Sequence, residues 1–222
     1  MDFFLPGTES TPAELFVLGD VTEDAFTFPG DISPTSIESV LQKMPGDDLV
    51  IHLNSYGGIT SAGIAIYNIL KGSGKNVTTV NEGFACSAAS LIFMAGSERI
   101  MRNNALLMIH NAWTCASGNA SELRNVADSL ETISASTAKI YEDSCNLSCE
   151  EISAMLETET WIPADMALST GMATKVQQAG HTNSAGYSSA FDAIQHAVMQ
   201  RGAQAQALGE RQLFDEIFGG FA

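Results

Sequence analysis

Residues 83–90 read Gly-Phe-Ala-Cys-Ser-Ala-Ala-Ser and join two apolar segments of the chain. The segment before them, Val77–Val80, is typical of a buried strand, and the segment after them, Leu91–Met94, is typical of a helix. An abrupt strand-to-helix turn leaves the first N–H groups of the helix without partners, and such groups favour a negatively charged oxygen. We therefore predict that Ser87 lies at this turn, with its hydroxyl beside the N–H group of Ala88. Taken alone, the octet also fits a buried turn of small residues without any chemistry.

The rest of the chain alternates between segments typical of strands and of helices. Strands are predicted at Glu14–Leu18, Leu49–Asn54, Val77–Val80, Arg99–Met101, Leu106–Ile109 and Ala173–Val176. Helices are predicted from Pro34 to Met44, from Ser61 to Leu70, at Leu91–Met94, from Asn119 to Cys145, from Ser148 to Leu156 and from Pro163 to Gly171. This alternation predicts an α/β fold with right-handed crossovers and a mainly parallel sheet. The continuous apolar run at 49–54 predicts a sheet that is covered on both faces.

The longest predicted helix begins with a capping box, formed by Asn119 and Glu122. A second capping box, Ser148 with Glu151, begins the helix after it. The long helix carries an apolar stripe at spacings of three and four: Leu123, Val126, Leu130, Ile133, Thr137 and Ile140. Such a stripe predicts packing on another helix from a second subunit, or on the helix's own domain.

Two adjacent glycines, Gly57 and Gly58, follow the strand at 49–54. In parallel sheets, ligands bind at the carboxyl ends of the strands, which is where both the glycine pair and Ser87 fall. Glycine lets a backbone N–H group approach a ligand oxygen without a side chain in the way. On its own the pair also fits an ordinary turn.

Two histidines and one cysteine are candidates for chemistry near these turns. His110 directly follows the strand at 106–109, a position that suits an exposed general base. His52 lies inside an apolar strand, where a satisfied core residue is the more common role. Cys86 adjoins Ser87 and is interpreted as packing. Four irregularly spaced cysteines predict reduced thiols, and Cys145 with Cys149 lacks the partners of a zinc site.

The composition excludes two classes of partner. The 222 residues carry 26 acidic and 10 basic side chains, for a formal net charge of -16. Nucleic acids and anionic membranes would repel such a chain, so neither is expected as a partner. The first residues lack the basic start of a secretory signal, and no apolar run reaches the length of a membrane span. We therefore expect a cytoplasmic protein.

Four regions are predicted along the chain. Residues 1–13 form an N-terminal arm, 14–176 the folded domain and 177–190 a polar linker rich in Gln, Gly, Ser, Asn and Ala. Residues 191–222 form an amphipathic tail, with apolar side chains at Phe214, Ile217, Phe218 and Phe221. This tail is expected to dock on a neighbouring subunit or a partner, because an exposed apolar helix is unfavourable in water.

With these motifs in view, the chain resembles the proteolytic subunit of the Clp protease family. Residues 54–63, Asn-Ser-Tyr-Gly-Gly-Ile-Thr-Ser-Ala-Gly, are similar to its strand-turn-helix segment. Gly83-x-Ala85-x-Ser87 matches its nucleophile motif, and Met108-Ile109-His110 matches its histidine. The resemblance spans roughly 14–176. It departs from the family at Tyr56, where proline is common, and at Glu159, where aspartate is usual.

The resemblance implies a serine endopeptidase that needs no metal or cofactor. Ser87 is implied as the nucleophile, His110 as the base and Glu159 as the third member of the triad, although Glu157 and Asp165 are close enough in sequence to compete. The N–H groups of Gly58 and Ala88 are implied as the oxyanion hole, and Gly57, Gly58 and Ile59 as the substrate-binding segment. Ser90 is the nearest rival hydroxyl, and Ser90→Ala is expected to be tolerated.

The resemblance also implies an assembly and a substrate class. The fold is expected to be that shared by the Clp proteolytic subunit and the crotonases, with a long protruding handle helix. Homo-oligomeric rings, typically stacked heptamers, are implied, with an AAA+ unfoldase as a possible partner. The segments Ser87–Ser90 and Glu159–Trp161 are more similar to the phage head maturation proteases, which trim capsid or scaffold protein during virion assembly. In that case the location is the host cytoplasm.

Two other functions stay open. Crotonase-like acyl-coenzyme A enzymes use paired backbone N–H groups, but their chemistry has no role for Ser87, His110 and Glu159. A ring or scaffold component with an inactive triad is the alternative from a different class. Reaction with a fluorophosphonate at Ser87 distinguishes the endopeptidase from both.

Overall fold

The computed structural model describes residues 3–24 and 30–178. Its strands are β1 (Phe4–Leu5), β2 (Ala13–Val17), β3 (Asp48–Ser55), β4 (Asn76–Cys86), β5 (Glu98–Arg102), β6 (Leu106–Ile109), β7 (Thr160–Pro163) and β8 (Lys175–Gln177). Its helices are α1 (Pro34–Lys43), α2 (Thr60–Gly72), α3 (Ala88–Met94), α4 (Ala120–Glu142), α5 (Cys149–Glu157) and α6 (Ala164–Ser169).

The strands form one mixed sheet in the order β1-β2-β3-β4-β5-β8, with β6 added beside the end of β4 and β7 beside β6. All pairs from β2 to β8 along this order are parallel, as is β4 with β6. The pairs β1–β2 and β6–β7 are antiparallel. The predicted α/β class with a mainly parallel sheet is therefore confirmed.

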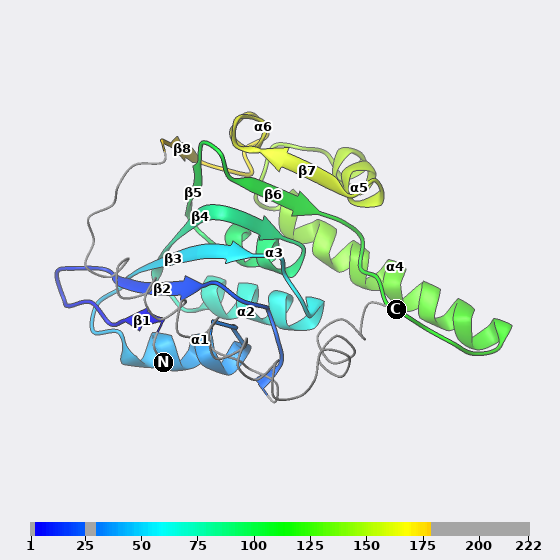
Figure 1. Ribbon diagram of the computed structural model, residues 1–222, viewed down its shortest axis with the longest axis horizontal. Coiled ribbons are helices and arrows are strands. Elements are labelled where there is room, and N and C mark those ends of the chain that lie inside the picture. The colour runs from blue at the N-terminus through cyan, green and yellow to red at the C-terminus, as the bar shows by residue number, and fades with distance from the viewer. Residues whose placement is uncertain (1–2, 25–29, 179–222) are drawn as a thin grey trace, which may run out of the picture.

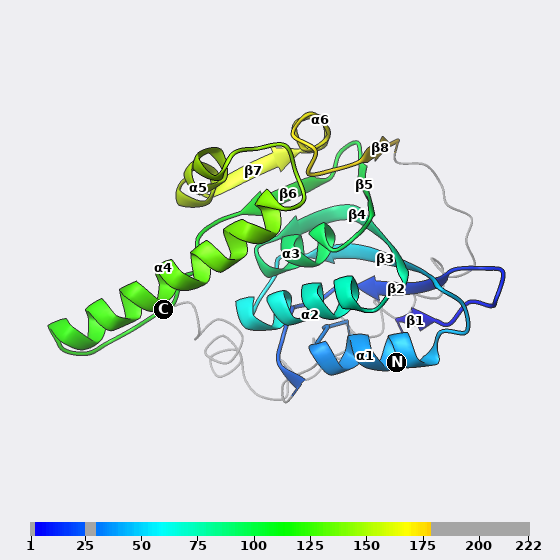
Figure 2. The same cartoon turned by 180° about the vertical axis from the view of Figure 1, so that it is seen from behind.

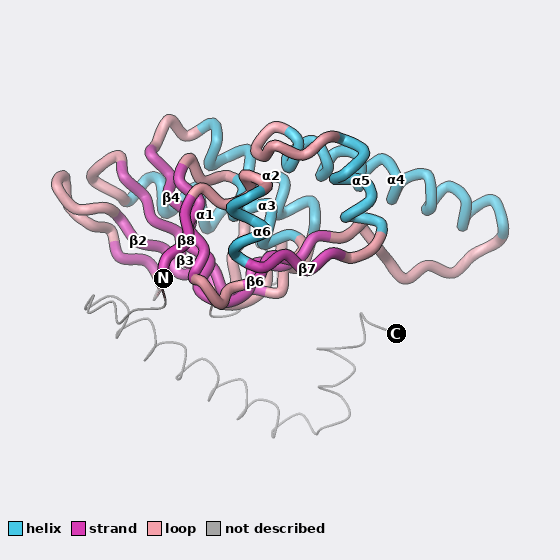
Figure 3. Tube along the Cα trace, turned by 90° about the horizontal axis from the view of Figure 1, so that it is seen from above, coloured by secondary structure: helices cyan, strands magenta, loops and turns pink. Residues whose placement is uncertain are grey.

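The helices α1, α2 and α3 lie side by side on one face of the sheet (Figures 1 and 2). Their apolar stripes meet the buried side chains of β3, namely Leu49, Ile51 and Leu53. On the opposite face His52 is partly buried and Asn54 is exposed. The described helices do not form the predicted cover on the second face, because α1 to α4 all lie on one side of the sheet (Figure 3). Side chains of β3 alternate between the buried face and the opposite face. The apolar residues at 49–53 gave no sign of this alternation in the sequence.

Strand β4 changes partner halfway along its length. It pairs with β5 as far as Asn81 and with β6 from Phe84 onward. Asn81 is fully buried at this fork, where its amide donates to the Leu106 carbonyl (2.9 Å) and its oxygen accepts from the Gly83 N–H group (3.1 Å). The fork brings the end of β4 against β6, so that the Ser87 N–H group donates to the Met108 carbonyl at 2.8 Å.

The helix starts follow the predicted caps. Ser33 caps α1, and the predicted capping boxes at Asn119 and Ser148 are formed at α4 and α5. Strands β1 and β7 were not predicted, because both are short and β7 includes a proline. Helix α4 ends at Glu142 and projects beyond the sheet (Figure 1).

The predicted regions at the two ends of the chain stay predictions. Strand β1, inside the predicted arm, pairs with β2 at the edge of the sheet. Of the predicted linker at 177–190, only Gln177 and Gln178 are described, and the predicted tail at 191–222, with its docking, lies outside the described residues.

Candidate active site

Ser87 lies between β4 and α3 in a conformation that few residues adopt. Its backbone has φ 50° and ψ −125°, and non-glycine residues with positive φ often mark functional sites. The glycine turn packs directly against it: a Cβ atom added to Gly57 would lie 2.8 Å from the Ser87 Cβ and 3.0 Å from the Ala88 nitrogen. Gly57 also has φ 106°, so this position requires glycine on two counts.

His110 follows β6 and faces Ser87. Its Nε2 lies 2.8 Å from the Ser87 Oγ, within the range of a hydrogen bond. Burial lowers the pKa of His110, and the negative charge of Glu159 offsets part of this effect. The imidazole is therefore neutral at pH 7 and can accept a proton from the serine hydroxyl.

Glu159 directly precedes β7, in which Thr160 pairs with Ile109, the residue before His110. Glu159 has φ 47°, and its charge acts on the pKa values of both His110 and Cys86. Within the described residues no hydrogen bond joins the Glu159 carboxylate to His110.

The two competing acids have other partners. The Glu157 carboxylate accepts a hydrogen bond from the Asn111 side chain at 2.8 Å. The Asp165 carboxylate accepts from the N–H group of Met166 at 2.9 Å, as the first-turn acid of α6. Neither of them is a cause of the pKa shift at His110, whereas Glu159 is.

The predicted oxyanion donors, Gly58 and Ala88, belong to the two turns that meet at Ser87. Val21 pairs with the glycine turn, donating to the Gly57 carbonyl and accepting from the Ile59 N–H group, both at 2.7 Å. The Gly58 N–H group takes no part in this pairing. Among the described residues, neither Gly58 nor Ala88 has a hydrogen-bond acceptor for its N–H group, so both are available to a substrate oxygen. The side chain of Ile59 is exposed beside them.

Cys86 is fully buried and unsuited to nucleophilic attack. Burial and the negative charge of Glu159 raise the pKa of Cys86 to about 11. Since the thiolate is the reactive form, the thiol is inert at neutral pH. This agrees with its interpretation as packing.

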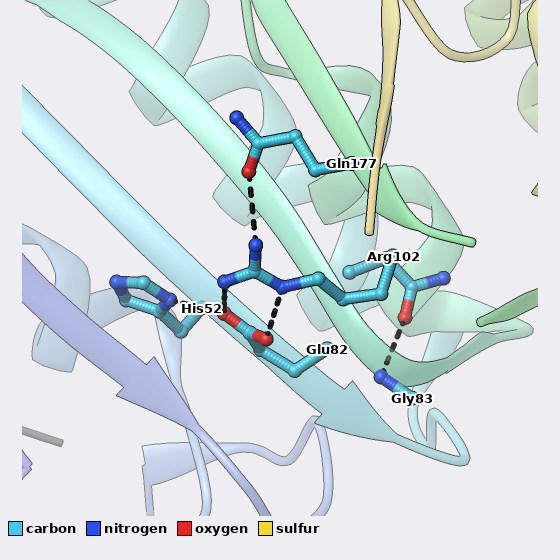
Figure 4. Close-up of polar contacts among 6 residues, drawn as sticks. His52, Glu82, Gly83, Arg102 and Gln177 are labelled. Carbon is cyan, nitrogen blue, oxygen red and sulfur yellow. Dashed lines mark hydrogen bonds and ion pairs between the residues drawn. The ribbon is translucent and has the colours of Figure 1, made fainter. Parts of the chain in front are cut away.

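His52 belongs to a separate polar cluster on the face of the sheet opposite α1, α2 and α3 (Figure 4). Its Nδ1 lies 2.8 Å from Glu82 Oε1, and its ring stacks on Phe16 at a centroid distance of 4.7 Å. Arg102 holds the same carboxylate through two hydrogen bonds of 2.8 and 3.1 Å and reaches Gln177 at 2.9 Å. The interpretation of His52 as a satisfied residue is confirmed, whereas Glu82 and Arg102 were missed.

Three aromatic side chains, also missed, form a surface beside the site. The Phe84 ring lies 5.2 Å from the Tyr56 ring and 6.1 Å from the Trp161 ring. Tyr56 and Trp161 are 66% and 43% exposed. Tyr56 directly precedes Gly57, Phe84 lies three residues before Ser87 and Trp161 lies two residues after Glu159, so an apolar surface flanks the polar site. Phe84 and Trp161 each lie within one of the motifs quoted above, and that position could have identified them as residues near the site.

Residues 3–24 and 30–178 contain neither a membrane-spanning helix nor a metal-binding cluster. In this part of the chain no helix is long and apolar enough to cross a membrane. The same residues contain no group of three His, Cys, Asp or Glu side chains that could hold a metal ion.

A serine hydrogen-bonded to a histidine at the carboxyl ends of parallel strands is the arrangement found in serine hydrolases built on α/β folds. A family model described as Clp protease matches residues 37–180. This match covers more than half of the 222 residues, and the chain belongs to the Clp protease family.

Curated relatives agree with this membership, and a solved structure agrees with the fold. The chain is 30% identical over 134 residues to an ATP-dependent Clp protease proteolytic subunit of Bacteroides fragilis, covering 60% of this chain and 65% of the relative. The corresponding protein of Bacteroides thetaiotaomicron is 29% identical over 134 residues, covering 60% and 61%. The chain thus matches less than two thirds of the length of these relatives. A ClpP1 mutant from Listeria monocytogenes superposes with a TM-score of 0.63 at 20% identity, over 74% of this chain and 91% of that one, which bears on the fold alone.

Proposed function

We propose that this protein is a serine endopeptidase that cleaves peptide bonds through an acyl-enzyme. The observation that carries the proposal is the 2.8 Å contact between Ser87 Oγ and His110 Nε2. In this mechanism His110 accepts the serine proton while Ser87 Oγ bonds to the substrate carbonyl carbon. The protonated imidazole then gives that proton to the leaving amine as the C–N bond breaks. Water repeats the sequence and releases the acid.

Glu159 is the third member of the triad in this proposal. Its carboxylate stabilises the imidazolium and fixes the ring tautomer. The pairing of Ile109 with Thr160 and the effect of the Glu159 charge on the His110 pKa support the role. The contact to His110 forms with substrate bound, since catalytic hydrogen bonds are often long in the free enzyme.

The N–H groups of Gly58 and Ala88 hold the oxyanion. Each such donor contributes about 3 kcal/mol to transition-state stabilisation in comparable sites. The substrate backbone lies along 57–59, where glycine leaves room for it. The surface of Tyr56, Phe84 and Trp161 receives apolar side chains of the substrate.

The natural substrate in this proposal is a capsid or scaffold protein during phage maturation, as the similarity of 87–90 and 159–161 to that branch suggests. The active form is a homo-oligomeric ring. Supporting this, the stripe on α4 divides in two: Thr137 and Ile140 are buried in the domain, whereas Leu123 and Ile133 are 42% and 38% exposed. An apolar stripe on a projecting helix favours a second copy as its cover. An AAA+ unfoldase is a further candidate partner.

Labelling with a fluorophosphonate, followed by mass spectrometry of the labelled peptide, tests the proposal. We expect one modified residue, Ser87, and complete loss of labelling in Ser87→Ala with the oligomeric state retained. An inert ring component or a crotonase-like enzyme gives no labelling at Ser87, and a crotonase-like enzyme binds a coenzyme A thioester instead. No labelling at Ser87, or binding of a coenzyme A thioester in place of labelling, refutes the proposal of an endopeptidase.

A further inference from the structure

A buried chain of hydroxyl groups connects helix α4 to the backbone of Ser87. The Ser90 Oγ lies 2.6 Å from the Ser87 carbonyl oxygen and 2.7 Å from the Tyr141 hydroxyl. Ser90 is 1% exposed and Tyr141 is 2% exposed. These residues are 51 positions apart in sequence, so only the packing of α3 on α4 brings them together.

The direction of the two hydrogen bonds follows from the number of protons. A carbonyl oxygen can only accept, so Ser90 donates its single hydroxyl proton to Ser87. The Tyr141 hydroxyl therefore donates to the Ser90 oxygen. Burial raises the pKa of Tyr141, which keeps this donor protonated across the working pH range.

The accepting carbonyl shares a peptide unit with the Ala88 N–H group. A peptide unit is planar, and in the trans form its C=O and N–H bonds point in opposite directions; the described chain contains no cis peptide. Both the Ser90 N–H group, at 2.9 Å, and the Ser90 hydroxyl donate to the Ser87 carbonyl, and holding this carbonyl toward Ser90 also sets the direction of the Ala88 N–H group. Support is needed here, because Ser87 has a φ of 50°, which a free chain rarely adopts.

We propose that Ser90 and Tyr141 are positioning residues that orient the Ala88 N–H group toward the oxyanion. This inference rests on the proposed function. It replaces the expectation that Ser90→Ala is tolerated: Ser90 is no rival nucleophile, since its hydroxyl is buried and bonded on both sides.

Tyr141→Phe is the main test, because it removes one oxygen and keeps the ring. The assay measures labelling of the full chain by a peptidyl fluorophosphonate, whose phosphoryl oxygen occupies the oxyanion position. A donor used only in the transition state changes the maximal rate and leaves binding intact. We expect a fall of about tenfold in the maximal labelling rate, the size of one lost hydrogen bond, with the half-saturating probe concentration unchanged.

Thr137→Val is the matched control. Thr137 is a buried hydroxyl one turn earlier on α4, and it donates to the Ser134 carbonyl of its own helix at 2.9 Å. This variant loses a buried hydrogen bond but no link to Ser87, so its labelling rate should equal that of the wild type. Unfolding by denaturant is measured for both variants to compare their losses of stability.

Ser90→Ala and the double variant Ser90→Ala/Tyr141→Phe complete the experiment. Because both residues act through one chain, the double variant should be no slower than Ser90→Ala alone. The inference is overturned if Tyr141→Phe labels at the wild-type rate, if only the half-saturating concentration changes, or if Thr137→Val loses as much rate. Failure of the proposed function looks different, since the wild type itself would then not be labelled at Ser87.

Discussion

Two histidines on one sheet have different surroundings. His52 lies within β3, stacked on Phe16 and bonded to a carboxylate that Arg102 also holds. His110 lies just beyond β6, where its Nε2 meets a neutral hydroxyl. A side chain inside a strand is fixed by neighbours on the same sheet face, whereas one at a strand end can face the turns of other strands. The chemistry of the two rings follows from this difference in position.

The electrostatic surroundings differ as well. Burial alone would raise the pKa of Glu82, but hydrogen bonds from His52 and Arg102 and the charge of Arg102 hold it below its ordinary value. At His110 burial dominates, and only the charge of Glu159 opposes it. One cluster therefore contains a fixed, compensated charge, and the other contains a neutral base that can change its protonation state.

The largest expected contrast is between His110→Ala and His52→Ala. Loss of His110 should lower fluorophosphonate labelling of Ser87 by about 10³-fold or more, because no other base in the described part of the chain bonds to the hydroxyl. Loss of His52 should leave labelling within about twofold and lower the free energy of unfolding by about 1–2 kcal/mol. Equal effects of the two variants on labelling would remove the distinction between the clusters.

Glu159→Gln should have the next largest effect, a fall in labelling of about 10²- to 10⁴-fold. The pH dependence carries a second signature. Labelling requires neutral His110. The labelling rate should therefore fall in acid as pH drops through the His110 pKa, which lies below the ordinary 6.5. This fall is the acid limb of the pH–rate curve. Since the Glu159 charge raises that pKa, its removal should shift the limb to lower pH. Glu157→Gln is the control and should leave rate and limb unchanged; a larger effect there would assign the acid to Glu157.

Arg102→Met tests the second cluster through stability. It leaves the mostly buried Glu82 carboxylate without its main counter-charge, which should lower the free energy of unfolding by about 3 kcal/mol. The contribution of Glu82 is complete above the unfolded pKa near 4.5 and disappears as pH falls through the lower folded value, so the loss should shrink in acid.

Lys175→Met is the matched control for that measurement. Its ammonium lies 3.7 Å from Glu98, and both side chains are about half exposed. Removing this surface pair should change stability by less than about 0.5 kcal/mol. If both variants lose the same free energy of unfolding in denaturant, the buried cluster contributes no more to stability than the surface pair.

Cys86→Ala should have the smallest effect. Labelling of Ser87 should stay within about twofold, because the thiol is protonated and only packs beside the site. In the folded protein a maleimide should modify the exposed Cys115 and spare Cys86 at neutral pH. Loss of labelling comparable to that of Ser87→Ala would identify Cys86 as the nucleophile.

Several features of this protein were determined by its sequence alone. The caps at Ser33, Asn119 and Ser148, the strand-to-helix turn at Ser87 and the strand-end position of His110 were all predicted at or near their observed places. These signals are local. A cap or a periodic stripe depends on residues only a few positions apart, so a short stretch of sequence is enough to predict it.

Other features were decided only by the tertiary structure. Glu159 acts on the His110 pKa because the folded chain pairs β6 with β7. One face of the sheet is without a helix among the described residues because of where the crossovers run. Glu82 is bonded to Arg102, 20 positions away, and Ser90 to Tyr141, 51 positions away. No sequence pattern encodes such a pairing, because a polar side chain must satisfy its hydrogen bonds with whatever group the folded chain places beside it.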